Sequence, residues 1–400
     1  MVKKVRVDQL KPGMFVSDFN CSWLDHPFFT NTAKLRDDKM IQKIIKNGIR
    51  EVYIDTKMGI DVADAMTADE VNRGVQKELT KVVEEKVENN DRVSFEDEIN
   101  MAKRIKSEAK NTVSNIMKDI KEGKEIETEY VEHIVGNMVD SVFRNQDALL
   151  SLGAIRKLDD YTYHHSVSVC TLMISFARSI GADTDTLKKI GMGALLHDIG
   201  KTLVPPEIMN KKGRLSDEDY IEIKKHPEHS YNLLKKTPGT SELMLLMAYE
   251  HHERSDGKGY PRGLKNDDIS LYGRAIAIVD VYDAITSDKC YKNKIHPTHA
   301  MGKLMEWGGY EFDKTLVQKF IRCIGIYPLG SVVLLESGMI GIVIRHGEEN
   351  ILKPVVRIVY NMKKEYYVEP YDVDLSLCET DSVISTERPE KWKIRPEMYL

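Results

Sequence analysis

Residues 251–261 read HHERSDGKGYP, and they are the most informative stretch of this 400-residue chain. They follow SELMLLMAYE (241–250), which has the composition of an ordinary apolar helix. Successive side chains on a helix point about 100° apart, so His251 and His252 cannot face one direction within a regular turn. At a helix end the backbone can loosen, and the glycines of DGKG supply that freedom. The pattern predicts that both imidazoles converge on one ion.

A second apolar helix carries two carboxylates. In GRAIAIVDVYDAITSDK (273–289), apolar residues cover nearly every helical face around Asp280 and Asp283. A buried charge costs several kcal/mol unless it is paired or binds a cation. For Asp280 the histidine-bearing helices elsewhere in the chain favour a metal. For Asp283 an ion pair with Arg274 and a metal site are equally good interpretations.

The stretch ALLHDIGK (194–201) ends a third apolar helix in His197-Asp198, followed by a glycine and Lys201. Taken alone, a histidine at this place is explained by the helix dipole. Together, imidazoles and a few carboxylates make a site suited to iron, manganese, zinc or nickel rather than calcium. A carboxylate can bridge two ions, and two ions about 3.5–4 Å apart suit phosphodiester hydrolysis.

Charge and composition limit the class of protein. The formal net charge is −5, which argues against a partner that is a nucleic-acid polymer or a membrane surface. Five cysteines lie far apart without a CxxC pair, as expected in a reducing compartment. The charged start MVKKVRVDQLKPGMFV lacks the apolar core of a signal peptide, and no long apolar run suggests a membrane span. We therefore expect a cytoplasmic protein.

The patterns predict a mainly α fold with four parts. Residues 1–65 mix short β-rich runs with one helix and form a small α+β, regulatory domain. Residues 66–126 are a charged helical linker, in which Met101, Ile105, Ala109, Val113, Ile116 and Ile120 recur at helical spacing. A packed linker is favoured over a dimer-forming helix. Residues 127–325 form an all-helical domain, and residues 326–400 a β-rich segment with alternating strands.

The chain resembles the HD superfamily of metal-dependent phosphohydrolases in the order of His165, the His197-Asp198 pair, His226, the His251-His252 pair and Asp280. The stretch HHERSDGKGYP is more specific, because it contains every element of the HHExxDGxGYP signature of the HD-GYP subfamily. Members of that subfamily hydrolyse bacterial cyclic dinucleotides. The resemblance covers roughly residues 140–325. The N-terminal part is similar to a domain of unknown function that often precedes HD-GYP domains, through VDQLKPGMFV (7–16) and IREVYIDT (49–56).

The resemblance implies a role for each matching residue. One metal ion would be held by His165, His197, Asp198 and Asp280. A second would be held by Asp198, as the bridge, with His226, His251 and His252. Lys201 would meet the scissile phosphate, so Lys201 and Asp198 are the catalytic candidates. The substrate-binding candidates are Gly259, Tyr260 and Pro261, in the loop that starts at Gly257, and Lys289 and Lys292, where family members often have arginine.

The same resemblance predicts iron or manganese and a binuclear centre. Some HD-GYP proteins hold a third ion with a glutamate four residues before the first histidine, and that position is Tyr161 here. A phenol with a pKa near 10 is a poor substitute for a carboxylate. Asp159 and Asp160 could replace it only if the helix began later. Six other histidines are not predicted ligands: His26, His164, His229, His296, His299 and His346, of which His229 could support a ligand.

The implied function is hydrolysis of cyclic di-GMP to the linear dinucleotide pGpG, with GMP as the alternative end product, by a metal-bridged hydroxide. Two alternatives stay open: a preference for the 3′,3′-cyclic GMP-AMP hybrid, and a weakly catalytic cyclic-dinucleotide sensor or partner-binding protein. The intact ligand set argues against the sensor. A homodimer through the linker and a diguanylate cyclase or other signalling partner complete the expectations.

Overall fold

The computed structural model describes residues 1–21, 31–83, 92–153, 161–209, 211, 215–287, 295–347, 352–378 and 380–400. The chain divides into two compact units, Met1–Leu79 and Thr80–Leu400. The mainly α class is confirmed, with a small sheet near each end of the chain. The four-part division made from sequence remains a prediction. In the described ranges, no helix is long and apolar enough to cross a lipid bilayer.

The first unit contains an antiparallel sheet in the order β1-β4-β2-β3. Its strands are β1 (Val2–Arg6), β2 (Phe15–Asp18), β3 (Ala33–Lys34) and β4 (Glu51–Asp55). Helix α1 (Asp38–Lys46) begins after Asp37, whose carboxylate accepts the N–H of Met40 at 3.0 Å. The buried face of α1 packs with the sheet because Ile41 and Ile44 join the same core as Val16 and Ile54. This is the α+β module that the sequence predicts.

The second unit is built mainly from helices. They are α3 (Phe95–Lys121), α4 (Thr128–Arg144), α5 (Gln146–Gly153), α6 (Tyr161–Ser179), α7 (Thr184–Leu196), the 3₁₀ helix η4 (Ile199–Leu203), α8 (Pro206–Met209), α9 (Asp217–Ile223), α10 (His226–Lys235), α11 (Glu242–Glu250), α12 (Leu271–Thr286), α13 (Pro297–Trp307) and α14 (Lys314–Ile324). Helix α2 (Ala68–Val83) precedes them and contains the boundary between the units.

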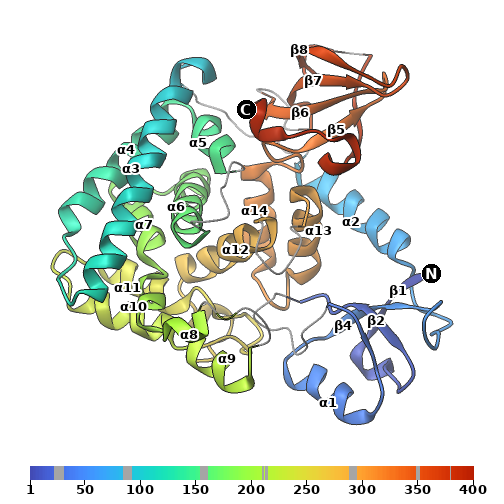
Figure 1. The fold of residues 1–400 in the computed structure, drawn as a ribbon, viewed down its shortest axis with the longest axis horizontal. Coiled ribbons are helices and arrows are strands. Elements are labelled where there is room, and N and C mark those ends of the chain that lie inside the picture. Colours follow the sequence, from blue (N-terminus) through green and yellow to red (C-terminus); the bar gives the residue numbers. More distant parts are fainter. Residues whose placement is uncertain are drawn as a thin grey trace. The chain divides into compact units, whose positions relative to one another are not determined.

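Helix α6 is the centre of the helical bundle. It contacts α3, α4, α5, α7, α12 and α14, and Figure 1 shows it enclosed by its neighbours. Its apolar residues are buried on nearly all sides, from Val167 to Ala177, which is the pattern of a helix inside a domain. One end of this helix carries His165, so the central position of α6 also places that histidine inside the protein.

The charged helix α3 packs as the sequence indicates, through one narrow stripe. Ala102, Ile105, Ala109, Val113, Ile116 and Ile120 are buried, and α3 contacts α4, α5 and α6. Met101, which belongs to the predicted stripe, is 43% exposed, and its neighbour Ala102 takes the buried position. Position 102, three residues before Ile105, continues the spacing of the buried stripe.

The C-terminal sheet is antiparallel in the order β8-β7-β6-β5-β9. Its strands are β5 (Val332–Leu335), β6 (Met339–Arg345), β7 (Val355–Asn361), β8 (Tyr366–Asp374) and β9 (Val383–Thr386). The expected alternation is wrong for β5 and β6, which are buried almost continuously. Two separate apolar clusters cover their two faces, one around Ile342 and the other around Val343.

A buried ion pair joins this sheet to the helices. His346, directly after β6, has its Nδ1 2.7 Å from Asp147 Oδ1 on α5 and its Nε2 2.8 Å from the carbonyl oxygen of Ile324. A carboxylate and a carbonyl can only accept, so both ring nitrogens must donate and the imidazole carries a positive charge. The backbone N–H of His346 also donates to Asp147, at 2.8 Å. This histidine, which the sequence leaves without a partner, therefore attaches the sheet to the bundle.

We predict that Asp147→Asn lowers the free energy of unfolding by about 3–5 kcal/mol, because it leaves a buried imidazolium without its counter-charge. Burial acts to raise the pKa of Asp147, but His346 holds that pKa below its ordinary value. The stabilisation is therefore present above the ordinary carboxyl pKa and disappears as the pH falls through the lowered pKa. Urea unfolding of both proteins between about pH 7 and pH 3 measures this difference.

The control is Asp119→Asn, which removes an exposed ion pair with Lys124 (3.1 Å) and should cost less than about 1 kcal/mol. Equal effects of the two substitutions, or a difference that does not shrink in acid, would contradict the role of the buried pair.

Candidate metal centre

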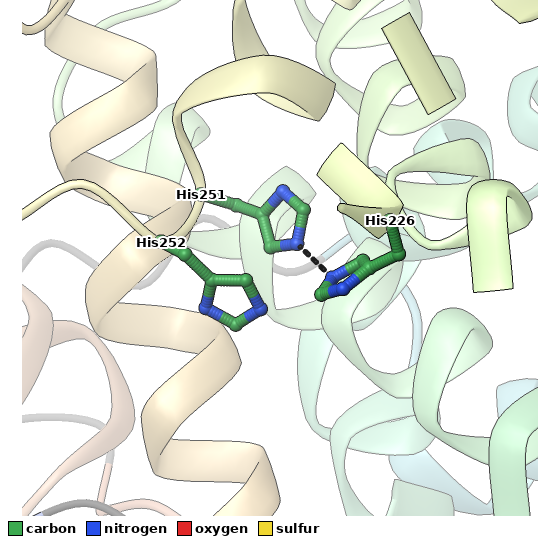
Figure 2. A group of neighbouring side chains, drawn as sticks. All are labelled: His226, His251 and His252. Atoms are coloured by element: carbon green, nitrogen blue, oxygen red, sulfur yellow. Dashed lines mark hydrogen bonds between the residues drawn. The ribbon is translucent and has the colours of Figure 1, made fainter. Parts of the chain in front are cut away.

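The structure brings seven predicted ligands into one buried cluster within the helical unit. They are His165, His197, Asp198, His226, His251, His252 and Asp280, from α6, the end of α7, the start of α10, the end of α11 and the middle of α12. His252 is partly accessible and the other six are buried. Figure 2 shows the imidazoles of His226, His251 and His252 converging from two helix ends.

Helix ends orient three of the imidazoles in the same way. The Nδ1 atoms of His197, His226 and His251 lie 2.7, 2.7 and 2.9 Å from the carbonyl oxygens three residues earlier. Because a carbonyl only accepts, each Nδ1 carries a proton and each ring directs Nε2 toward the cluster. This arrangement selects the tautomer that a metal ligand needs. His251 and His252, which could not face one direction within a regular helical turn, thus both lie at the cluster because α11 ends before them.

His165 is oriented by a carboxylate instead. Its Nδ1 lies 2.7 Å from Asp283 Oδ2, and its Nε2 lies 2.8 Å from Asp280 Oδ1. The predicted ion pair with Arg274 is therefore wrong, and Asp283 belongs to none of the candidate metal sets of the described chain. Arg274 pairs with Asp267 at 2.6 Å and with Asp313 at 3.2 Å. Asp283 lies more than two turns further along α12, on the part of the helix that faces α6, so it meets His165 and not Arg274.

The two oxygens of Asp198 face two different sets of histidines. Oδ2 lies 3.6 Å from His165 Nε2 and 3.4 Å from His197 Nε2. Oδ1 lies 3.2 Å from His226 Nε2 and 3.7 Å from His251 Nε2. A carboxylate placed in this way can bridge two ions. Candidate ligand atoms lie within 4.8 Å of one another in three sets: His165-His197-Asp280, His197-Asp198-His251 and His226-His251-His252.

The electrostatics of the cluster favour a cation. Burial acts to lower the pKa of His197, but Asp198 and Asp280 raise it to about 10. Burial holds the pKa values of His251 and His252 well below their ordinary values, so those rings stay neutral. Three buried atoms, His197 Nε2, Asp198 Oδ1 and His252 Nε2, make no hydrogen bond within the described part of the chain. Neutral imidazoles and carboxylates with such atoms directed inward fit a transition metal.

Lys201 and the glycine before it extend the cluster. The ammonium of Lys201 forms an ion pair with Asp198 Oδ2. Burial alone would raise the pKa of Asp198, but Lys201 and His197 hold it well below its ordinary value. Gly200 lets η4 approach α10, because a Cβ there would lie 2.2 Å from the carbonyl oxygen of His226. In residues 194–201 an apolar helix is followed by Gly200, and this glycine lets His197 and Asp198 lie next to His226.

One buried carboxylate and two glycines shape the loop after α11. Glu253 accepts the backbone N–H groups of Arg262 at 2.7 Å and Leu264 at 2.9 Å. Gly257 has φ +75°, which favours glycine. A Cβ on Gly259 would lie 2.4 Å from the backbone nitrogen of Arg254, so only glycine fits. The signature HHExxDGxGYP therefore contains two kinds of residue. His251 and His252 are candidate metal ligands, whereas Glu253, Gly257 and Gly259 fold the loop, and the motif alone does not show which residues have which role.

The substrate-binding candidates divide into two groups. Tyr260 stacks on His252, with ring centroids 4.7 Å apart, and Gly259 and Pro261 flank it next to the cluster. Lys289 and Lys292 lie outside the described residues. Of the other histidines, His164, His229, His296, His299 and His346 belong to none of the candidate metal sets of the described chain, and His26 lies outside the described residues.

Comparisons with known proteins identify the family of this chain. The HD domain family matches residues 151–316, and the domain of unknown function DUF3391 matches residues 2–131. The cyclic di-GMP phosphodiesterase PA4108 of Pseudomonas aeruginosa is 36% identical over 397 residues, which cover 99% of this chain and 94% of the relative. The chain belongs to the HD-GYP family.

Two further matches are more limited. The 3′3′-cGAMP-specific phosphodiesterase 1 of Vibrio cholerae is 35% identical over 154 residues, which cover 38% of this chain and 36% of that protein. A solved structure, Bd1817, a HDG"Y"P protein from Bdellovibrio bacteriovorus, is 19% identical with a TM-score of 0.47 and covers 80% of this chain and 98% of its own.

We predict that Asp283→Asn weakens metal binding about 10- to 100-fold, because an amide orients His165 less strongly than a carboxylate and makes its ring less basic. Chelator competition followed by elemental analysis measures the affinity. Asp267→Asn is the control, since Asp267 is 93% exposed at its side chain and pairs with Arg274 away from the cluster. Equal affinities for the Asp283→Asn variant and the unchanged protein would show that the His165–Asp283 contact has no part in metal binding.

Proposed function

We propose that this chain is a metal-dependent phosphodiesterase that hydrolyses cyclic di-GMP. The carrying observation is the carboxylate of Asp198, whose two oxygens face separate sets of histidines. One ion would be held by His165, His197, Asp198 and Asp280, and a second by Asp198, His226, His251 and His252. Iron and manganese suit this donor set. When bound, such ions stabilise charge on phosphoryl oxygens and acidify water.

The residues of this chain position and neutralise the substrate. Lys201 has no lone pair while it is charged, so it acts on phosphate rather than on metal. Its ammonium, next to Asp198, donates to the scissile phosphate and assists the departing ribose oxygen. Gly259, Tyr260 and Pro261 form the loop beside the substrate. Lys289 and Lys292 contact the other phosphate as point charges instead of bidentate arginine forks.

The base preference rests on similarity and not on the site. Metal ligands and lysines recognise phosphate, which every cyclic dinucleotide shares. The relative that aligns over nearly the whole chain is named for cyclic di-GMP, and the cGAMP-specific relative aligns over 38% of the chain. We therefore favour cyclic di-GMP, with pGpG as the first product and GMP as the product of a second hydrolysis. The 3′,3′-cyclic GMP-AMP hybrid is the competing substrate.

The site argues for catalysis over sensing. A sensor needs to bind the dinucleotide but has no need for a bridging carboxylate with Lys201 next to it. A cytoplasmic location, a homodimer through residues 66–126 and a diguanylate cyclase or other signalling partner stay predictions from the sequence.

The test is turnover of cyclic di-GMP, the GMP-AMP hybrid and cyclic di-AMP, separated by chromatography after anaerobic incubation with iron or manganese. Asp198→Ala should lower turnover at least about 10³-fold and reduce bound metal, because both ions lose a ligand. The exposed Asp217→Ala, at the start of α9, is the control. An Asp198→Ala protein that keeps most of its metal and activity would exclude the bridging role.

We predict two transition-metal ions per chain. Helix α6 begins at Tyr161, so the position one turn before His165 is helical and carries a phenol. Elemental analysis of protein purified without oxygen should approach two ions. Asp159 and Asp160 lie outside the described residues. A reproducible value near three that falls on changing Asp160 to Asn would replace the binuclear centre with a trinuclear one.

A further inference from the structure

A lysine that the metal cluster does not use lies against the Tyr260 ring. Lys224 follows α9, two residues before His226, and its Nζ is 5.0 Å from the centre of the Tyr260 ring. The same ring stacks on His252 at 4.7 Å with an angle of 29° between the planes. The Lys224 ammonium and the imidazole of a candidate metal ligand therefore share one aromatic neighbour. Lys224 and Tyr260 are both partly accessible, so neither side chain is closed off from a ligand in solution.

Of the neighbouring cations, Lys258 and Lys265 are exposed and have no carboxylate partner among the described residues, and four others are paired. Lys201 pairs with Asp198, Arg262 with Glu250, Arg254 with Asp256 and Glu311, and Lys225 with Glu222. Lys224 differs from them, because no carboxylate among the described residues pairs with it. Its contact with Tyr260 contributes about 0.5–1 kcal/mol at an accessible site. A positive charge kept next to an anion-binding centre without a protein anion is available to a ligand anion.

We propose that Lys224 binds the phosphate of the cyclic dinucleotide that is not being hydrolysed. This inference rests on the proposed function. The candidate metal ligands and Lys201 serve the scissile phosphate. The second phosphate is already assigned Lys289 and Lys292, and Lys224 adds a cation to it from among the described residues. Lys224 lies between α9 and α10, with its Nζ over the Tyr260 ring, which ties phosphate binding to the loop of residues 257–261. Lys224 is thus a substrate-binding residue outside the HHExxDGxGYP signature.

The competing explanation is structural, in which Lys224 only holds Tyr260 in place. Lys224→Met separates the two, because methionine keeps an unbranched stem that packs on the ring and removes the charge. Lys224→Arg keeps the charge. Lys225→Met is the matched control: it removes the same charge from the next residue, which is exposed and pairs with Glu222.

The experiment measures kcat and KM of the metal-loaded full chain for cyclic di-GMP. For Lys224→Met we expect KM to rise roughly 10- to 100-fold, the effect of one hydrogen bond to a charged group, while kcat changes less than about threefold. Lys224→Arg should restore most of the affinity, and Lys225→Met should behave like the unchanged protein. A KM within about twofold of the unchanged protein for Lys224→Met overturns the proposal.

A second substrate, bis(4-nitrophenyl) phosphate, carries one phosphate and tests the metal centre alone. Lys224→Met should hydrolyse it at the unchanged rate. If both substrates lose activity equally, Lys224 supports the loop or the metal centre and the proposal fails. If the unchanged protein hydrolyses the small diester but no cyclic dinucleotide, the proposed function is wrong. The inference on Lys224, which depends on that function, is then wrong as well. An active protein whose Lys224→Met variant keeps its KM overturns the inference alone.

Discussion

The position of Asp198 between two sets of imidazoles is the constraint on which the rest of the site depends. A fully buried carboxylate is tolerated only with compensating charge, and here Lys201 and His197 supply it. Three separate helix ends must meet at this side chain, and Gly200 permits the approach of η4 to α10. The helical bundle around α6 can be understood as the scaffold that holds those ends together.

The cluster uses the helix ends for a second purpose. A regular helix leaves its last carbonyl groups without partners, and these carbonyls are well placed to accept from a histidine that follows directly. Two of the cluster's histidines use such carbonyls, at the ends of α7 and α11, and a third uses the carbonyl that ends α9. One contact therefore satisfies a backbone group, selects the tautomer and directs Nε2 inward.

The charged groups around this centre have different structural roles. Glu253 folds the loop by accepting backbone N–H groups, and Asp283 orients a ligand. His346 and Asp147 join the C-terminal sheet to the bundle. Lys224 has none of these duties within the described chain, and this contrast is the reason for assigning it to the substrate.

The sequence by itself determined the class of fold, the candidate ligands and the loop signature. These are local properties: apolar periodicity gives helices, and a glycine after an apolar helix marks its end. It did not determine the partner of Asp283, because His165 lies 118 residues away and Arg274, on the same helix, is also a plausible partner for a carboxylate. It also left His346 without a role and described β5 and β6 as alternating. Only the tertiary structure decided these points, because which faces are covered and which distant charges meet depend on how the helices and the sheet pack.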